Sequence, residues 1–221
     1  MAWRDTPPYR ADHVGSLLRP ERLLKARDDF AAGSIDRNEL RGIEDDAIRD
    51  VVAMQEEVGL QSATDGEFRR ASWHMDFIYE LGGISKAQDD LTVKFRNADG
   101  EIEFKPAALH VDSTITLEKP IFAQDFEFLQ SVVTKNTPKL TIPSPSMVHY
   151  RGGAAAIDPD VYSDMDEFWS DLTSAYADQV KAIAGLGCEY LQFDDTSLAY
   201  LNDPKQRQML ADRGEDADHL H

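Results

Sequence analysis

The sequence contains a single cysteine, Cys188, among its 221 residues. One cysteine forms no internal disulfide and supplies no thiolate-rich metal cage, so a disulfide framework and a cysteine-dominated zinc site are both excluded. A reducing compartment fits this usage, and the polar, proline-containing residues 1–10 lack the hydrophobic core of a secretion signal. We therefore expect a cytoplasmic protein.

Long hydrophobic runs are also absent, because no stretch approaches the ~20 apolar residues that span a bilayer. Basic residues are few: 23 Lys and Arg stand against 41 Asp and Glu, which gives a formal net charge of −18. Such a charge repels nucleic acid and anionic membranes and leaves no basic stripe to follow a phosphate backbone. We expect small-molecule ligands, with no nucleic-acid or membrane partner.

Two segments of the chain share one plan, in which a long amphipathic helix ends at glycine and a short apolar strand follows. The first pair is predicted at residues 36–59 and 60–64, with a capping box at the start of the helix. The second pair is predicted at residues 164–187 and 188–193. Repeats of this kind are typical of parallel α/β folds, in which helices cover the faces of the sheet.

Further strands are predicted at residues 9–14 and 139–142. Between them, residues 91–103 alternate around a turn sequence, which predicts a β-hairpin, and residues 108–117 continue with β-branched side chains. We therefore expect one domain, 1–221, that carries an antiparallel insertion at about 85–117.

Ligands of parallel α/β folds bind at the carboxyl ends of the strands, so the residues that follow each predicted strand are candidates. The first strand is followed by His13, Gly15 and Ser16. The glycine allows backbone amides to approach a carboxylate closely, and the serine hydroxyl adds a donor. A helix-entry loop with a surface histidine is the alternative interpretation.

Carboxylates follow two other predicted strands. Asp65 and Glu67 come after residue 64 and stand beside two arginines, an arrangement that suits an amine and an anion, or a structural cluster of ion pairs. Asp194 and Asp195 end the last predicted strand, where adjacent buried carboxylates require a cation or a substrate amine. Neighbouring strand residues face opposite ways, so we expect Asp194 to face the ligand and Asp195 to cap the next helix.

Two more residues are candidates of lower specificity. Trp73 belongs to an aromatic-rich stretch that either stacks on a flat heterocycle or packs a helix against the core. Ser146 follows a predicted strand in a Ser-Pro turn and offers a hydroxyl group.

Three motifs occur in an order that resembles the cobalamin-independent methionine synthase family, specifically its short single-barrel paralogues. They are HVGSLLRP at 13–20, TDGEFRR at 64–70 and YLQFDDTS at 190–197, and the likeness extends over about residues 9–201. The resemblance implies a TIM (β/α)8 barrel. It also implies a zinc-dependent methyltransferase that moves the methyl group of 5-methyltetrahydrofolate to the thiol of homocysteine, with zinc holding the thiol as thiolate.

The resemblance also implies roles for individual residues. Gly15 and Ser16 match the positions that contact the carboxylate of the amino acid, and Glu67 and Asp194 match carboxylates near its amino group. With His13 and Asp65 beside them, these residues form the expected substrate site. The resemblance further places Ser146, and Trp73 near it, on the folate side.

The sequence departs from the family at the metal. The zinc ligands of the family are a His-x-Cys pair, a glutamate and a further cysteine from late strands, and nothing after Asp195 supplies them. We expect them beyond His221, and His219 and His221 are not assigned to metal. This chain is thus expected to be the N-terminal portion of a barrel, truncated after about the fifth strand, without its metal or an assigned catalytic residue.

An incomplete barrel has open strand edges, so self-association is expected. Two other functions stay open at this point. One is an amino-acid or thiol binding protein without catalysis. The other is a barrel enzyme like uroporphyrinogen decarboxylase, although that site gathers several arginines for many carboxylates, and the charge of −18 opposes it.

Overall fold

The computed structural model describes residues 12–87, 93–97, 100–104, 108–150, 152–212, 214, 216 and 218. The chain divides into two compact units. Unit 1 comprises Met1–Trp73, Phe122–Ile142 and Ala182–Asp194, and unit 2 comprises His74–Ile121, Pro143–Lys181 and Asp195–His221. The expectation of a single domain over 1–221 stays a prediction.

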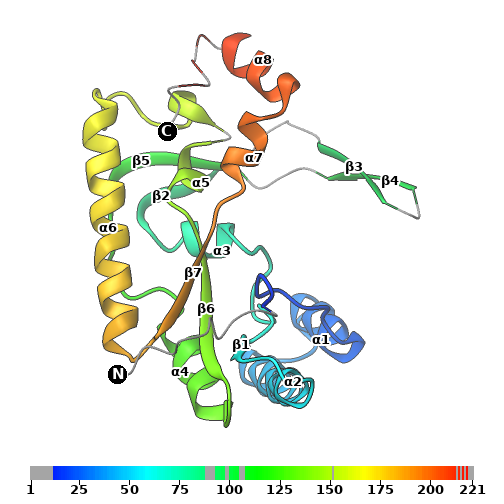
Figure 1. Ribbon diagram of the computed structural model, residues 1–221. Coiled ribbons are helices and arrows are strands. Elements are labelled where there is room, and N and C mark those ends of the chain that lie inside the picture. The colour runs from blue at the N-terminus through cyan, green and yellow to red at the C-terminus, as the bar shows by residue number, and fades with distance from the viewer. Residues whose placement is uncertain are drawn as a thin grey trace. The chain divides into compact units, whose positions relative to one another are not determined.

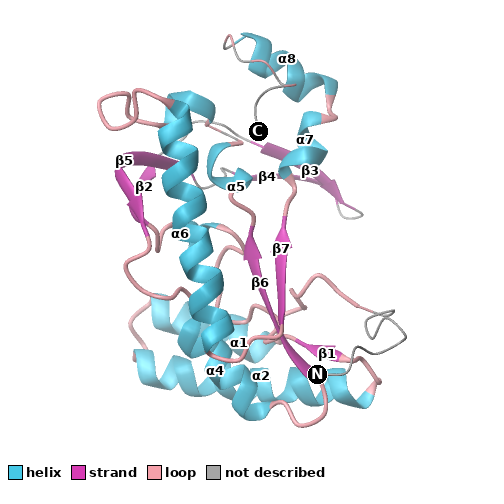
Figure 2. Ribbon diagram, turned by 60° about the vertical axis from the view of Figure 1, so that its left-hand side comes forward, coloured by secondary structure: helices cyan, strands magenta, loops and turns pink. Residues whose placement is uncertain are grey.

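Unit 1 is built around a parallel strand pair with helices. Its elements are α1 (Glu21–Ala31), α2 (Arg37–Glu57), β1 (Ser62–Ala63), α4 (Ala123–Val132), β6 (Thr137–Pro143) and β7 (Tyr190–Asp194). The strand order is β1-β6-β7, with β1 parallel to β6, and Figures 1 and 2 show β6 beside β7. The described strands therefore confirm a mixed α/β class and form a partial sheet rather than a closed barrel.

Helix α2 forms where the sequence predicts it. Asp36 accepts hydrogen bonds from the backbone N–H groups of Asn38 and Glu39, and the Glu39 carboxylate accepts from the N–H of Asp36, which completes a capping box. Gly59, with φ +83°, follows the last turn. The buried stripe of α2 faces α1, α4 and β1 and consists of Leu40, Glu44, Ala47, Ile48, Val51, Val52 and Gln55.

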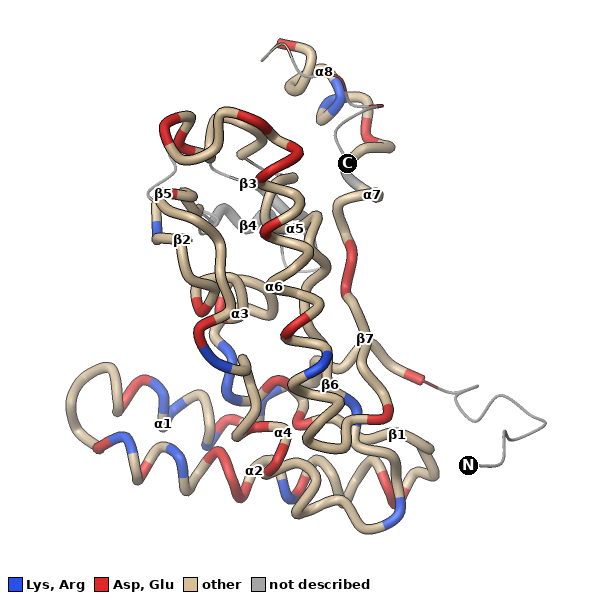
Figure 3. The backbone as a smooth tube through the Cα atoms, turned by 90° about the vertical axis from the view of Figure 1, so that its left-hand side faces the viewer, with Lys and Arg blue, Asp and Glu red and all other residues tan. Residues whose placement is uncertain are grey.

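Helix α1 was not predicted from the sequence. Its N-cap, Pro20, makes no side-chain capping bond, and only Leu23 and Ala26 are buried, so its periodicity is weak. Figure 3 shows Lys, Arg, Asp and Glu spread over both α1 and α2. Several of them form exposed ion pairs, such as Lys25 with Asp29 at 2.5 Å. Charged side chains therefore cover the exposed faces of these helices, whereas Glu44 on α2 is buried.

The strand predicted at residues 9–14 is wrong in the part that can be seen. Residues 9–11 lie outside the described residues, and Asp12–Val14 have no strand conformation. Side chains rather than a neighbouring strand occupy their carbonyl groups: Lys139 Nζ donates to His13 O, and Gln192 Nε2 donates to Val14 O at 3.0 Å. The strands predicted at 60–64, 139–142 and 188–193 are present as β1, β6 and β7, with different bounds.

Unit 2 contains the antiparallel strands. Its elements are α3 (Met75–Ile78), β2 (Gly82–Ala87), β3 (Val93–Asn97), β4 (Gly100–Phe104), β5 (Ala108–Thr116), α5 (Ser146–His149), the 3-10 helix η1 (Gly153–Ala156), α6 (Met165–Gly185, whose last residues belong to unit 1), α7 (Ser197–Leu201) and α8 (Pro204–Asp212). β3 and β4 pair antiparallel with Asn97 opposite Gly100, which confirms the hairpin, and its tip lies outside the described residues. β5 pairs antiparallel with β2, a strand that was not predicted.

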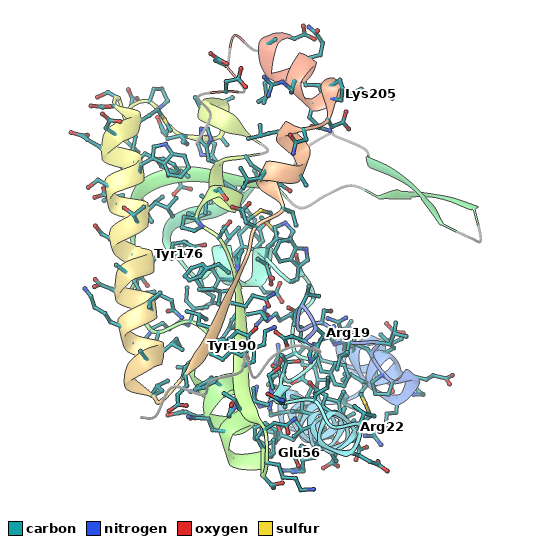
Figure 4. All side chains as sticks on the ribbon, viewed as in Figure 1. Arg19, Arg22, Glu56, Tyr176, Tyr190 and Lys205 are labelled. Carbon is teal, nitrogen blue, oxygen red and sulfur yellow. The ribbon has the colours of Figure 1, made fainter. Side chains whose placement is uncertain are left out.

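Aromatic side chains fill the core of unit 2. The ring of Phe77 lies 5.4 Å from that of Tyr176, which projects from α6 (Figure 4). Gln179, also on α6, accepts from the N–H of Ile121 and donates to its carbonyl, both at 2.8 Å. These contacts hold α6 in unit 2.

Within the described ranges, no helix is long and apolar enough to cross a membrane.

Candidate functional site

Two loops of unit 1 that carry the predicted site residues are bonded to each other. Thr64 Oγ1 donates to the carbonyl of Gly15 at 2.7 Å, and the N–H of Leu17 donates to the carbonyl of Gly66 at 3.1 Å. The segment 13–17 and the segment 64–70 are therefore joined. They are called loop 13–17 and loop 64–70 below.

Loop 64–70 contains two consecutive residues in the left-handed region. Gly66 has φ +67° and Glu67 has φ +58°. A Cβ on Gly66 would lie 2.7 Å from the ring of Phe68, so glycine is required there. Asp65 Oδ1 accepts from the N–H of Glu67 at 2.9 Å and holds the turn. A non-glycine residue with this φ is costly, and such residues cluster at functional sites.

Two arginines from outside the loop stabilise this conformation. Arg19, labelled in Figure 4, donates to the carbonyls of Glu67 and Arg70, each at 2.9 Å. Arg27 donates to the carbonyls of Phe68 at 2.5 Å and Arg70 at 3.0 Å. Charge-assisted bonds of this kind are stronger than neutral ones, so the backbone of loop 64–70 is firmly held.

The Glu67 carboxylate is buried, with 3% of the residue exposed. Its Oε1 accepts from Thr141 Oγ1 at 2.9 Å and from Arg70 Nη1 at 3.4 Å. Its Oε2 is buried and has no hydrogen-bond partner among the residues that the structure describes. Burial raises the pKa of Glu67, although Arg70 and Thr141 partly offset this, and the charges of Asp65 and Asp194 raise the pKa further. The arrangement suits a cationic ligand group.

The two arginines of loop 64–70 face different surroundings. Arg70 is 4% exposed and donates to the carbonyl of Thr141 at 2.8 Å, while its guanidinium lies 4.2 Å from the ring centre of Phe122. Arg69 instead pairs with Asp45 at 2.5 Å and Asp125 at 3.3 Å. Both arginines are thus bonded within the protein, and Arg70 alone of the two pairs with Glu67.

The paired aspartates at the end of β7, Asp194 and Asp195, make different contacts. Asp195 Oδ1 accepts from the N–H of Ser197 at 2.9 Å, at the start of α7, which confirms the predicted capping role. Asp194 is half-buried and accepts from Gln192 Nε2. Burial raises the pKa of Asp194, while Gln192, Arg70 and Lys139 act in the opposite direction. Its predicted role at a ligand stays a prediction.

Gly15 lies against strand β6. It has φ +127°, and a Cβ built on it would lie 2.6 Å from Thr141 Cγ2. Both the conformation and the close approach therefore require glycine at this position. Ser16, the next residue, is exposed. Their predicted contact with a substrate carboxylate stays a prediction.

Gln55 sets the proton position of His13. The Gln55 Nε2 donates to the carbonyls of Val51 and Thr64, at 3.1 and 2.9 Å, and its Oε1 accepts from the N–H of Thr64 at 3.0 Å. The same oxygen lies 2.9 Å from His13 Nε2, so this ring nitrogen is the donor. In the neutral ring, Nδ1 is then the acceptor, and it is buried without a partner among the described residues.

The two residues predicted on the folate side lie as follows. Trp73 ends the first segment of unit 1, and its carbonyl accepts from Arg70 Nη1 at 3.3 Å. Ser146, in unit 2, donates to Asp195 Oδ2 at 3.0 Å and lies 2.7 Å from Ser144 Oγ. Their proposed proximity to folate stays a prediction.

Zinc, which the family resemblance implies, requires a group of His, Cys or carboxylate ligands. Within the described ranges, no three such residues come together in a group that could hold a metal ion. Cys188 instead donates to the carbonyl of Tyr190, and burial raises the pKa of its thiol. The described residues therefore do not fit a zinc site.

Two polar residues on β6 were missed by the sequence analysis. Thr141 contacts Glu67 and Gly15, as described above. Lys139 Nζ donates to Asp12 Oδ2 at 2.9 Å and to His13 O at 2.5 Å, and it lies 4.7 Å from the ring centre of Tyr190. The sequence contains a signal for both residues, because Lys139 and Thr141 are two positions apart in a buried strand, share one face of it and alternate with apolar neighbours.

Comparisons with known proteins place the chain among methionine synthase relatives, although no family model matches it. It is 41% identical over 197 residues to the uncharacterized protein YxjG of Bacillus subtilis, which covers 89% of this chain and 50% of that protein. It is 26% identical over 185 residues to the methionine synthase of Sulfurisphaera tokodaii, covering 84% of this chain and 51% of the synthase. The chain thus spans about half the length of these relatives.

Solved structures give the same picture. A putative vitamin B12-independent methionine synthase from Listeria monocytogenes matches with a TM-score of 0.73 and 38% identity, over 90% of this chain and 56% of that one. A B12-independent methionine synthase from Shewanella sp. W3-18-1, in complex with selenomethionine, matches with a TM-score of 0.56 and 19% identity, over 81% of this chain and 48% of that one. At 19% identity, the likeness to the Shewanella enzyme shows a shared fold alone. The resemblance predicted from the three motifs is confirmed.

Proposed function

This chain is related to the cobalamin-independent methionine synthase family, and from that premise we propose that it forms part of a methyltransferase acting on homocysteine. The methyl donor in this proposal is 5-methyltetrahydrofolate, and the fold is part of a TIM barrel. Loop 13–17, loop 64–70 and Asp194, all in unit 1, bind the amino acid.

The observation that carries the proposal is the unpartnered oxygen of Glu67. A buried polar atom without a partner is costly, and a ligand that supplies the missing donor removes that cost. An ammonium group has three donors and a positive charge, so it satisfies Glu67 Oε2 and reaches a second carboxylate, for which we propose Asp194. Arg70 already balances part of the charge of Glu67, so the second carboxylate keeps the site favourable for a cation.

The carboxylate of the amino acid is proposed to bind at loop 13–17. The absence of a side chain at Gly15 lets this loop pack directly against Thr141, and the exposed Ser16, the next residue, offers the carboxylate a hydroxyl donor. The hydrogen bonds between the two loops then keep the sites for ammonium and carboxylate at a fixed separation.

In the proposed reaction the homocysteine sulfur gives up its proton and forms a bond to the methyl carbon as the bond from that carbon to folate N5 breaks, and N5 takes up one proton in place of the methyl group, so that the protons balance. The residues described here hold the amino-acid end of the acceptor. Rigid binding at that end limits the positions open to the sulfur, which is the usual contribution of binding groups to group transfer. Homocysteine and methionine share this end, so both are expected to bind.

Isothermal titration calorimetry with L-homocysteine and L-methionine tests the proposal. Binding is expected with a chelator present, because the described residues do not fit a zinc site. Glu67→Gln and Asp194→Asn should each weaken binding by about 1 to 3 kcal/mol through loss of a charge-assisted contact. Glu57→Gln, a change at an exposed position on α2, is the matched control and should leave affinity unchanged. Absence of binding by the unaltered chain contradicts the proposal.

A further inference from the structure

Thr141 contacts both loops of the candidate site at once. It lies on β6 with 2% of the residue exposed. Its Oγ1 donates to Glu67 Oε1 at 2.9 Å, and its Cγ2 occupies the position 2.6 Å from where a Cβ of residue 15 would be. Thr141 therefore acts together with the hydrogen bonds between the two loops to set how close loop 13–17 and the Glu67 carboxylate come to each other.

We propose that Thr141 is a positioning residue that fixes the separation of the ammonium and carboxylate subsites and so selects α-amino acids, in which both charged groups share one carbon. This inference rests on the proposed function, since it assumes that Glu67 binds the ammonium and Gly15 borders the carboxylate. It adds a specificity determinant that none of the three sequence motifs contains.

The hydroxyl of Thr141 decides which carboxylate oxygen meets the ligand. An ionised carboxylate only accepts, so the Thr141 proton points at Glu67 Oε1, and Arg70 Nη1 donates to the same hydroxyl at 3.4 Å. Arg70 Nη2 also holds the Thr141 carbonyl at 2.8 Å. Glu67 is thereby fixed through Oε1, and Oε2 is left for the ligand.

The methyl group of Thr141 acts on the other loop. Because threonine is branched at Cβ, its χ1 rotamers are restricted, and the positions of Oγ1 and Cγ2 are coupled. The hydroxyl that holds Glu67 thus also fixes the methyl group against Gly15. Serine would keep the hydroxyl and lose this coupling, whereas valine would keep the branched shape and lose the hydrogen bond.

The pH dependence of binding gives a second, independent sign of the contact with Glu67. Three charged groups act on Glu67: Arg70, Asp65 and Asp194. Burial raises the pKa of Glu67, and the hydrogen bond from Thr141 lowers it. Without that hydrogen bond the pKa of Glu67 rises further, so the carboxylate takes up its proton earlier as the pH falls. The loss of ammonium binding on acidification then has its midpoint at a higher pH.

The experiment measures calorimetric affinities of the 221-residue chain for L-methionine and for the β-amino acid with the same side chain, over a range of pH. Thr141→Val should weaken L-methionine binding by about 10-fold and move the pH midpoint of binding upward. Thr141→Ser should retain the midpoint but lower the preference for the α-amino acid by about 3-fold or more. Thr173→Val, at an exposed position on α6, is the control and should change neither quantity.

The outcomes separate the two proposals. If the unaltered chain binds neither amino acid, the proposed function itself is wrong. If it binds L-methionine and Thr141→Val leaves affinity and pH midpoint unchanged, the function stands and the role of Thr141 is wrong. An equal loss for both ligands without a pH shift also overturns it, because that result reports general loosening. Should Thr141→Val fail to fold in a thermal scan, the serine variant decides, and an unchanged α-over-β preference overturns the inference.

Discussion

The guanidinium of Arg19 donates a hydrogen bond of 2.9 Å to the backbone carbonyl of Glu67, a residue whose φ is +58°. The two residues are 48 positions apart, so a distant segment of the chain maintains the strained backbone of loop 64–70. The orientation of the Glu67 carboxylate therefore depends on a residue that is not expected to contact the ligand.

Replacement of Arg19 by methionine should weaken L-methionine binding by about 10-fold, because the strained turn loses a charge-assisted bond. Calorimetry measures the affinity, and urea unfolding measures stability. The control is Arg22→Met, which removes only an exposed ion pair with Asp50 and should change neither value appreciably. Equal affinities of the two variants would show that Arg19 does not position Glu67.

Gly15→Ala should reduce the free energy of unfolding more than Gly33→Ala does. Both glycines have positive φ, +127° and +72°, so alanine is strained at either site. Only at Gly15 does the new Cβ also meet Thr141, since nothing lies within 4 Å at Gly33. We expect a cost of about 1 to 3 kcal/mol at Gly15 from strain, plus the overlap. Equal costs in urea unfolding would contradict the close contact.

Asp12→Asn should destabilise the chain far more than Asp29→Asn, although the ion pair of Asp29 is the shorter one. Lys25 and Asp29 are 2.5 Å apart, but the Lys25 side chain is 74% exposed, and such pairs contribute about 0 to 1 kcal/mol. The Lys139 side chain is 0% exposed, and loss of its partner should cost about 3 kcal/mol or more. Urea unfolding of both variants gives the comparison, and a ranking in the opposite order would be evidence against this reasoning.

Glu56 should make stability depend on pH in the acid range. Hydrogen bonds from the hydroxyl and N–H of Thr134 and from the N–H of Lys135 lower the pKa of Glu56 from 4.5 to about 2. A lowered pKa stabilises the fold above pH 4.5, and this contribution is lost as the pH falls through about 2.

The corresponding variant is Glu56→Gln, with Glu57→Gln as the neighbouring control. At neutral pH the free energy of unfolding of Glu56→Gln should be lower than that of the unaltered chain by on the order of 1 kcal/mol. The difference is small because solvent screens the exposed hydrogen bonds of the Glu56 carboxylate. The difference should shrink as the pH approaches 2, and the control should show no such trend. A pH-independent difference in urea unfolding would assign the effect to something other than the charge of Glu56.

The sequence predicts those parts of the fold whose signals are local. The capping box and apolar stripe of α2 lie within its own residues, and the helix forms where expected. Helix α1 buries too few side chains to show a period, and β2 is recognised only through its pairing with β5. Residues 12–14 look like a strand by composition, yet side chains of Lys139 and Gln192 occupy their carbonyls.

The same distinction applies to the candidate site. Glu67 and Gly15 stand out because their motifs place a carboxylate and a glycine after predicted strands, although residues 12–14 have no strand conformation. Their partners do not stand out, because Arg19 and Thr141 are joined to Glu67 across 48 and 74 positions of the chain. Such contacts depend on the packing of β6 and loop 64–70, which no single window of sequence contains.

The composition of unit 1 from three separate segments has a consequence for the order of folding during synthesis. Strand β6 lies between β1 and β7 in the sheet, yet the residues of unit 2 come between these strands along the chain. At usual rates of translation, the segment up to Trp73 emerges roughly 6 to 24 s before β7 is complete. During that interval α1 and α2 pair locally, while the sheet waits for residues with large sequence separation, the slow class of contacts in folding. The three-stranded sheet of unit 1 therefore cannot be completed until Asp194 has left the ribosome.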